Sequence, residues 1–177
     1  MKRRAILLGL LALTLTFSVH AGISYQPSIS ASFGGTFTYR FEDMIRSSVS
    51  GRIELDPLAL QIDERHVISL PIHVSYTSRT PFFDGYCLNS HTDLGIGISY
   101  RYRVNDILSL RTVADIDLRL VMEVYGGIYA FGITMEPWFN LNRKFAVTVP
   151  LRVSFTKGEI ALSPGIAIAI VPFGDKL

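Results

Sequence analysis

The amino-acid sequence predicts an all-β protein, specifically an eight-stranded antiparallel up-and-down transmembrane β-barrel. Three observations lead to this fold class. Apolar and polar side chains alternate through four consecutive segments between Asn105 and Gly165. The turns between those segments have lengths that keep the apolar residues on one face. After the first 21 residues the sequence has no run of 18 apolar residues, which is about the length that a transmembrane helix requires.

The alternation is clearest between Leu108 and Val124. The even positions of this stretch are almost all apolar, whereas the odd positions include five charged residues. A period of two indicates a β-strand with one apolar and one polar face. A soluble strand buries its apolar face, whereas a strand of a transmembrane barrel turns that face outward to lipid. The choice between these two orientations decides which functions are possible.

The first 21 residues have the organisation of a secretory signal peptide. A basic segment, Lys2 to Arg4, precedes an apolar run from Ala5 to Phe17, and Val19-His20-Ala21 has the small-x-small pattern of a cleavage site. We therefore expect a signal peptide over 1–21 and a single barrel domain over 22–177. The alternative is a buried N-terminal helix or a membrane anchor, but the apolar run is shorter than the roughly 20 residues that cross a bilayer.

The charge of the mature chain is close to zero. The chain has 17 Lys and Arg and 15 Asp and Glu residues, and the leader holds three of the basic ones. The mature chain therefore has 14 basic against 15 acidic residues. This balance gives no basic patch for nucleic acid, so we expect no nucleic-acid partner.

Eight strands are expected along the mature chain. The first includes Gly34-Gly35, where we expect a bulge or bend, and the second is weakened by Asp56-Pro57. Polar residues 42–50 and the longer segment 77–92 are expected to be loops. The predicted strands cover 23–41, 51–62, 66–76, 94–104, 108–125, 128–139, 145–156 and 159–173.

The turns provide an internal check on this assignment. A two-residue turn places residues of opposite parity on one face, while three- or five-residue turns keep the parity. Two-residue turns are expected at Gly126-Gly127 and Lys157-Gly158, a three-residue turn at 105–107, and a five-residue turn at 140–144. At all four turns, the apolar residues before and after the turn have the odd or even numbering that the turn length requires. The sequence therefore favours a continuous meander with one apolar face.

The polar face is predicted to line the interior of the barrel. Eight strands enclose only enough space for side chains to fill, so charges of both signs would form a paired network there. On the apolar face, aromatic residues lie near the strand ends, as in the interfacial belts of membrane barrels. A soluble, lipocalin-like barrel with the apolar face inside is the alternative. The predicted lumen-lining charged residues are Arg101, Arg103, Arg111, Asp115, Asp117, Arg119, Glu123, Glu136 and Arg152. The predicted aromatic belts comprise Tyr100, Tyr102, Phe139 and Phe145 at one end and Tyr76, Tyr129, Phe131 and Phe155 at the other.

The mature chain resembles the small eight-stranded outer-membrane barrels of Gram-negative-type cell envelopes, of the OmpA-like, OmpX-like and OmpW-like kinds. The resemblance is one of architecture and includes a last strand that ends at Phe173, although Gly174 to Leu177 follow it. It implies an outer-membrane location, a lipid bilayer and the barrel-insertion machinery as partners, and both termini in the periplasm. Loops 42–50 and 77–92 would then face outward.

Three classes of function are compatible with such a barrel. The resemblance favours porin-like passive transport of small solutes, although an interior crowded by Arg and Asp makes a wide pore improbable. A structural or adhesin-like surface protein is the alternative, because loop 77–92 carries an aromatic group and the lone cysteine, whose thiol we expect to be free. The residues of this predicted exposed group are Phe82, Phe83, Tyr86 and Cys87.

A lipid-modifying enzyme is the third class. The His73-Val74-Ser75 spacing matches the His-x-Ser pair of one outer-membrane enzyme family, but the sequence assigns no carboxylate to orient the histidine. His66 and His91 have no metal-ligand spacing. We therefore expect no enzymatic activity, no catalytic residues, no cofactor and no metal.

Overall fold

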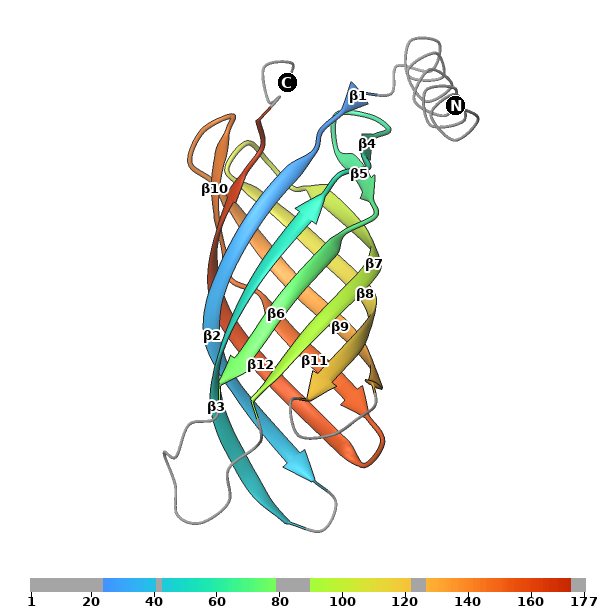
Figure 1. The fold of residues 1–177 in the computed structure, drawn as a ribbon. Coiled ribbons are helices and arrows are strands. Elements are labelled where there is room, and N and C mark those ends of the chain that lie inside the picture. The colour runs from blue at the N-terminus through green and yellow to red at the C-terminus, as the bar shows by residue number, and fades with distance from the viewer. Residues whose placement is uncertain (1–23, 41–42, 79–89, 122–126, 173–177) are drawn as a thin grey trace, which may run out of the picture.

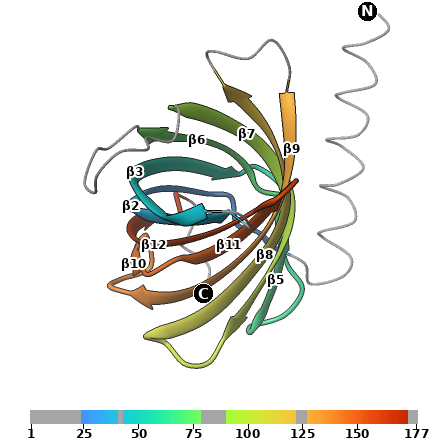
Figure 2. The ribbon, with the colours of Figure 1, turned by 90° about the horizontal axis from the view of Figure 1, so that it is seen from below.

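The computed structural model describes residues 24–40, 43–78, 90–121 and 127–172, and these form a closed antiparallel β-barrel of eight strands. Figures 1 and 2 show the strands tilted around a common axis, from the side and along the barrel. Neighbouring strands in the sequence pair with each other, and β12 (Glu159–Ile170) closes the barrel by pairing with β2 (Ser28–Arg40). The predicted fold class is confirmed. Among the described residues, no helix has the length and apolar character to cross a membrane.

Four of the eight barrel strands are continuous along their length. β7 and β8 pair over thirteen residues, and β8 pairs with β9 over a further thirteen. These strands are β7 (His91–Arg103), β8 (Leu108–Val121), β9 (Gly127–Asn140) and β12.

Each of the other four barrel strands is divided into two segments at a proline. Proline has no backbone N–H to donate to a ladder, and the regular pairing stops at these four prolines. By contrast, Pro137 and Pro164 are accommodated within β9 and β12. The sequence predicted such an interruption only at Pro57; the others at Pro27, Pro71 and Pro150 were not expected. The divided strands are β1 (Ser24–Tyr25) with β2, β3 (Asp43–Asp56) with β4 (Ala59–Gln61), β5 (His66–Ser69) with β6 (Ile72–Ser78), and β10 (Phe145–Thr148) with β11 (Leu151–Thr156).

Three tight turns of the same construction close one end of the barrel, the upper end in Figure 1. In each, the side-chain oxygen of an Asp or Asn accepts hydrogen bonds from the backbone N–H groups two and three residues later, at 2.7–2.9 Å. The residues are Asp63, Asn105 and Asn142. The predicted three-residue turn at 105–107 is confirmed, because Val104 N donates to Leu108 O. The predicted five-residue turn at 140–144 is too long, since Leu141 N donates to Phe145 O.

The opposite end of the barrel differs from the prediction at four places. The predicted loop 77–92 is too long, because Thr77 and Ser78 belong to β6 and His91 and Thr92 to β7. Residues 43–50, expected as loop, belong to β3 and pair with β2. The β2–β3 register is continuous through Gly34-Gly35, and the irregularity lies between Thr38 and Arg40 instead. Gly127, expected in a turn, pairs with Leu120 inside the β8–β9 ladder. The two-residue turn at Lys157-Gly158 is confirmed, with Gly158 at φ 85°.

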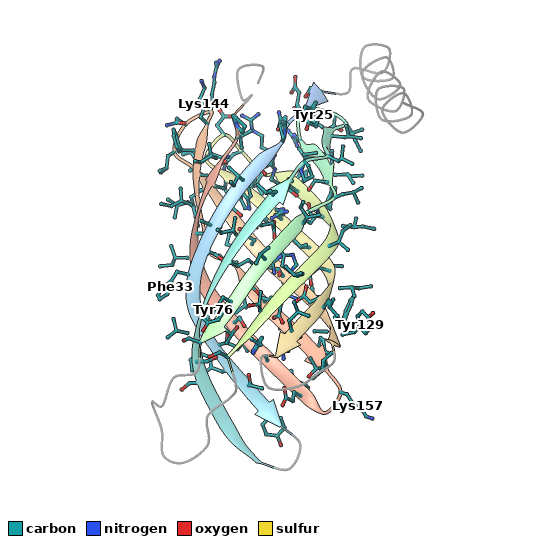
Figure 3. All side chains as sticks on the ribbon, in the orientation of Figure 1. Tyr25, Phe33, Tyr76, Tyr129, Lys144 and Lys157 are labelled. Atoms are coloured by element: carbon teal, nitrogen blue, oxygen red, sulfur yellow. The ribbon has the colours of Figure 1, made fainter. Side chains whose placement is uncertain are left out.

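The apolar residues lie on the outside of the barrel. Ile98, Ile116 and Ile166 are each at least 57% exposed, whereas the neighbouring Ser99, Asp115 and Asp117 are buried. In Figure 3, sticks project from both sides of the barrel outline, near the labelled Phe33 and Tyr129, and these two residues and Tyr76 are exposed. This arrangement agrees with a lipid-facing outer surface and excludes the soluble, apolar-inside barrel. Of the aromatic residues expected in the two belts, seven are exposed: Tyr76, Tyr100, Tyr129, Phe131, Phe139, Phe145 and Phe155.

Gly34 allows β2 and β12 to approach closely. A Cβ atom at Gly34 would lie 2.1 Å from the carbonyl oxygen of Pro164, whereas a Cβ atom at Gly35 would meet nothing closer than 3.8 Å.

We expect Gly34→Ala to lower the free energy of unfolding by about 1–3 kcal/mol, because the backbone of β12 at Pro164 would have to move. Gly35→Ala is the matched control and should leave it nearly unchanged. Urea titration in detergent, followed by the mobility of unboiled samples on a gel, measures both; equal midpoints for the two variants would contradict the close approach.

Candidate functional site: the charged interior

Arg111 forms the centre of the barrel interior near the end that carries the three Asx turns. It lies on β8 and is buried, with hydrogen bonds to three carboxylates from two other barrel strands. Its Nη2 donates to both oxygens of Asp56, at 3.0 and 2.9 Å. Its Nη1 donates to Glu54 at 2.5 Å and to Glu136 at 3.0 Å. Such bidentate, charge-assisted contacts hold the guanidinium in one orientation.

Hydroxyl groups from three strands, β2, β5 and β10, donate to the carboxylates around Arg111. Ser28 and Ser69 donate to the two oxygens of Asp56, at 3.0 and 2.8 Å. Thr148 donates to Glu136 at 2.5 Å. A buried charge is tolerated only when its remaining hydrogen-bonding capacity is filled, and these hydroxyls fill it. We refer to Arg111 with Glu54, Asp56 and Glu136 as the Arg111 layer.

A second cluster lies next to this layer, around Arg152. The Arg152 guanidinium pairs with Asp115 and, at 2.6 Å, with Asp117. Arg52 connects the two clusters, because its Nη2 lies 2.5 Å from Glu54 and 3.3 Å from Asp115. His73 Nε2 lies 2.8 Å from Asp117 Oδ1. The charges therefore form one network that crosses the barrel from strand to strand.

Two glycines make space for this second cluster. A Cβ at Gly132 would lie 2.1 Å from the Arg152 guanidinium, and one at Gly95 would lie 2.2 Å from both Asp117 and the ring of His73. Small residues on the inner face thus alternate with large charged ones. The same packing explains why the inner positions predicted from the sequence mix glycine with arginine.

A third cluster lies beyond the second, toward the opposite end. Arg119 Nε donates to Asp93 at 3.0 Å, and its Nη1 lies 3.9 Å from Glu159. His91 Nε2 lies 3.7 Å from Asp93. This cluster extends the pairing of opposite charges along the inner face of β7 and β8.

The side chains of His73, Asp115 and Asp117 lie close enough to hold a metal ion, with ligand atoms within 4.8 Å of one another. Arg152 already contacts both carboxylates, however, and supplies the positive charge that a cation would bring. The donor set therefore fits an ion-pair cluster better than a metal site.

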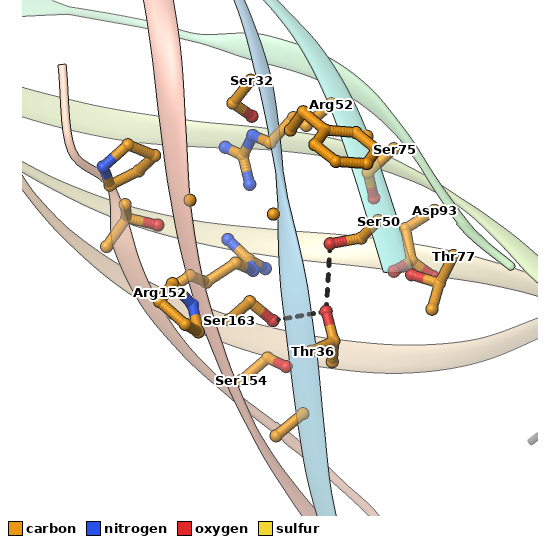
Figure 4. Close-up of a pocket in the computed structure, with 18 of the residues that line it drawn as sticks. Ser32, Thr36, Ser50, Arg52, Ser75, Thr77, Asp93, Arg152, Ser154 and Ser163 are labelled. Carbon is orange, nitrogen blue, oxygen red and sulfur yellow. Dashed lines mark hydrogen bonds between the residues drawn. The ribbon is translucent and has the colours of Figure 1, made fainter. Parts of the chain in front are cut away.

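Two cavities lie along the barrel axis, and the Arg111 side chain lines neither of them. The smaller, of about 90 Å³, lies among Arg52, Arg152 and hydroxyl groups such as Thr36. Figure 4 shows those hydroxyls pointing into it, with Thr36 bonded to Ser50 at 3.0 Å and to Ser163 at 2.9 Å. The larger, of about 860 Å³, lies at the end with the Asx turns, and we call it the vestibule. The two cavities have no lining residue in common.

The structure places most of the predicted lumen-lining residues on the inner face, but not all in the network. Arg111, Asp115, Asp117, Arg119, Glu136 and Arg152 form the ion pairs described above. Arg101 contacts Gln26 at 3.3 Å and lies over Trp138, at 4.7 Å from the ring centroid. Arg103 pairs at 2.7 Å with Asp106, which is 93% exposed at a turn. Glu123 lies outside the described residues, as do Phe82, Phe83, Tyr86 and Cys87.

Sequence reasoning missed seven members of the network, including His91 and Glu159 of the third cluster. Arg52, Glu54 and Asp56 lie at alternate positions of one strand, and this spacing predicts that they share a face. The interruption at Pro57 made the strand assignment weak, so the pattern was not used. Asp93 lies between the predicted loop 77–92 and the strand predicted from residue 94, and His73 was considered only with Ser75. Their partners lie on strands distant in sequence, which no local pattern identifies.

Comparison with known proteins identifies the fold. No protein-family model and no curated protein sequence matches the chain. Among solved structures, the chain is similar to the Neisserial surface protein A (NspA), with a TM-score of 0.67 and 10% identity, over 85% of this chain and 99% of that one. It is also similar to Ail, the attachment invasion locus protein of Yersinia pestis, with a TM-score of 0.58 and 9% identity, over 83% and 98% of the two chains. The chain has the fold of the small eight-stranded outer-membrane β-barrels.

Arg111→Met should strongly destabilise the barrel. The substitution leaves three buried carboxylates without their shared cation, so we expect a loss of about 3–5 kcal/mol in the free energy of unfolding. Arg103→Met is the matched control, since its ion pair is solvent-exposed and should contribute about 0–1 kcal/mol. Urea unfolding in detergent micelles, followed by tryptophan fluorescence, measures both. Similar midpoints for the two variants would mean that the Arg111 layer does not hold the barrel together.

Proposed function

We propose that the chain is an integral outer-membrane protein with a closed lumen, and that its function lies in the surface it presents beyond the membrane. The proposal combines a location in the outer membrane with a structural or surface-interaction role. The observation that carries it is the Arg111 layer: Arg111 lines neither cavity, and its partners Glu54 and Glu136 line the smaller one.

The Arg111 layer opposes passive conduction. A solute passing along the axis would have to separate a buried guanidinium from three carboxylates, at a cost of several kcal/mol. Within the described residues the hydroxyl-lined cavity holds only about 90 Å³, which is room for a few water molecules. Both features favour a barrel that acts as a scaffold over one that acts as a pore.

Two features favour a role at the outer surface. The β2–β3 hairpin extends past the end of β6 in Figure 1: β6 ends at Ser78 opposite Val49, while β2 and β3 remain paired to Arg40 and Asp43. The structurally similar Ail bears a name that refers to attachment and invasion. Segment 79–89, with its predicted aromatic group, follows β6 directly in the sequence.

Passive transport of small solutes remains the second candidate, because the vestibule of about 860 Å³ gives wide access from one end. Transport would require the Arg111 layer to rearrange.

The lipid-modifying hypothesis receives less support: His73 is buried on the inner face and Ser75 lines the inner cavity, whereas lipid would contact the outer surface. We keep the prediction that the chain is not an enzyme.

Conductance across a planar bilayer distinguishes the two main candidates. We expect the refolded mature chain to insert without producing stable single-channel steps, because ion pairs fill its interior. A gel shift on boiling serves as the control that the inserted protein is folded. Reproducible single-channel steps in the folded wild-type protein would contradict the closed lumen and favour transport.

The surface role has its own measurement. Proteoliposomes that carry the full mature chain are tested for retention on immobilised laminin, fibronectin and collagen. We expect retention on at least one of them, and its loss when 79–89 is replaced by a short Gly-Ser turn. Absence of retention on all three, or retention that the replacement leaves unchanged, would contradict binding through this surface.

A further inference from the structure

The vestibule contains more positive than negative charge. Its charged lining consists of Arg65, Arg101, Arg103 and Arg143 against Glu64 and Asp106. Arg103 and Asp106 pair with each other at 2.7 Å. The remaining set has three guanidinium groups and one carboxylate, so the vestibule is a basic cavity in a mature chain that is almost neutral overall.

Arg101 forms no ion pair with any of the described residues. It lies directly opposite Arg111 in the β7–β8 ladder, and both face inward. Arg111 forms ion pairs with three carboxylates, whereas Arg101 donates a hydrogen bond to the neutral side chain of Gln26, at 3.3 Å. A partly buried cation without a carboxylate is costly, and a bound anion would remove that cost.

The groups that contact Arg101 directly are neutral, and one of them has a donor without an acceptor. The Trp138 ring packs against the Arg101 guanidinium, and its buried Nε1 has no hydrogen-bond acceptor among the described residues. Gln26 Nε2 already donates to Gln61. The immediate contacts of Arg101 thus include a buried donor without an acceptor, as expected where a ligand supplies acceptors.

We propose that the vestibule binds a soluble polyanion of the phosphate or polycarboxylate class, with Arg101 as its anchor at the floor and Arg65 and Arg143 at the rim. Guanidinium groups suit such ligands because their donors match two oxygens of one phosphate or carboxylate. The vestibule opens among the turns at the barrel end and not on the lipid-facing side, so the ligand comes from the aqueous phase. The inference does not depend on whether the barrel conducts.

Pyrophosphate is a suitable probe, and isothermal titration of the mature chain in zwitterionic detergent measures its binding. We expect saturable binding that weakens as sodium chloride is raised. Arg101→Gln should weaken it by about tenfold or more, because the anchoring charge is lost. Lys157→Gln, which removes an exposed charge at the opposite end, is the matched control and should bind as the wild type does. The absence of binding to the wild type would overturn the proposal.

A second variant keeps the test decisive if Arg101→Gln does not refold. The double substitution Arg65→Gln and Arg143→Gln changes only exposed turn residues and should also weaken binding and reduce its salt dependence. Binding as tight as that of the wild type in this variant, or in folded Arg101→Gln, would overturn the site. Repeating the titration in bilayers with and without anionic lipid tests the source of the ligand: unchanged affinity supports a soluble anion, while competition by the lipid would contradict it.

Discussion

The contact between Arg111 and three carboxylates is the interaction on which the rest of the structure depends. Charged side chains can fill an eight-stranded barrel only if each finds a partner, because the interior has little space for water. Arg111 meets this requirement at one level, and Arg152 and Arg119 meet it at the next two. Since the inner face is polar, the alternation of the strands places the apolar residues outside. The lipid-facing surface therefore follows from the same pattern that builds the interior.

The interior also explains the distribution of small residues and prolines. Gly95 and Gly132 are required where the His73, Asp117 and Arg152 side chains cross the barrel, since a Cβ there would overlap them. The prolines that divide four strands lie near the ends of the regular pairing segments, and backbone hydrogen bonds such as Gly97 N to Pro71 O continue across the interruptions. The barrel thus stays closed although half of its strands are interrupted.

Local patterns were enough to predict the fold class, and they were most reliable in β7 to β9. There the apolar positions face lipid and the polar positions face the network, so parity alone assigns each side chain to a face. The pattern fails where that contrast is missing. Residues 43–50 were predicted as loop because polar residues occur at both odd and even positions of this segment, for example Ser47 and Ser48, which obscures the alternation. The interruption at Pro71 was missed because Leu70 and Ile72 keep the apolar phase on either side of it.

The candidate sites were less predictable than the fold. The sequence placed six of the network residues on the inner face, but the pairs that matter join strands that are not neighbours in sequence, such as Glu54 with Arg111 and His73 with Asp117. The tilt of the strands sets which residues share a level, and no local pattern encodes it. The vestibule depends in addition on three turns that meet at one end, so its basic character appears only once the barrel is closed.

The most direct test of the account is the accessibility of nitroxide labels to oxygen and to a water-soluble nickel complex in bilayers. Single cysteines at Ala114, Ile116 and Ile166 sample the outer face, and those at Ser99, Val113 and Thr134 sample the interior, in a chain with Cys87 replaced by serine. The account predicts strong oxygen relaxation at the first three positions and weak relaxation by either agent at the other three. Strong relaxation by the nickel complex at Ala114, Ile116 and Ile166 would contradict a lipid-facing apolar surface around a closed, charged interior.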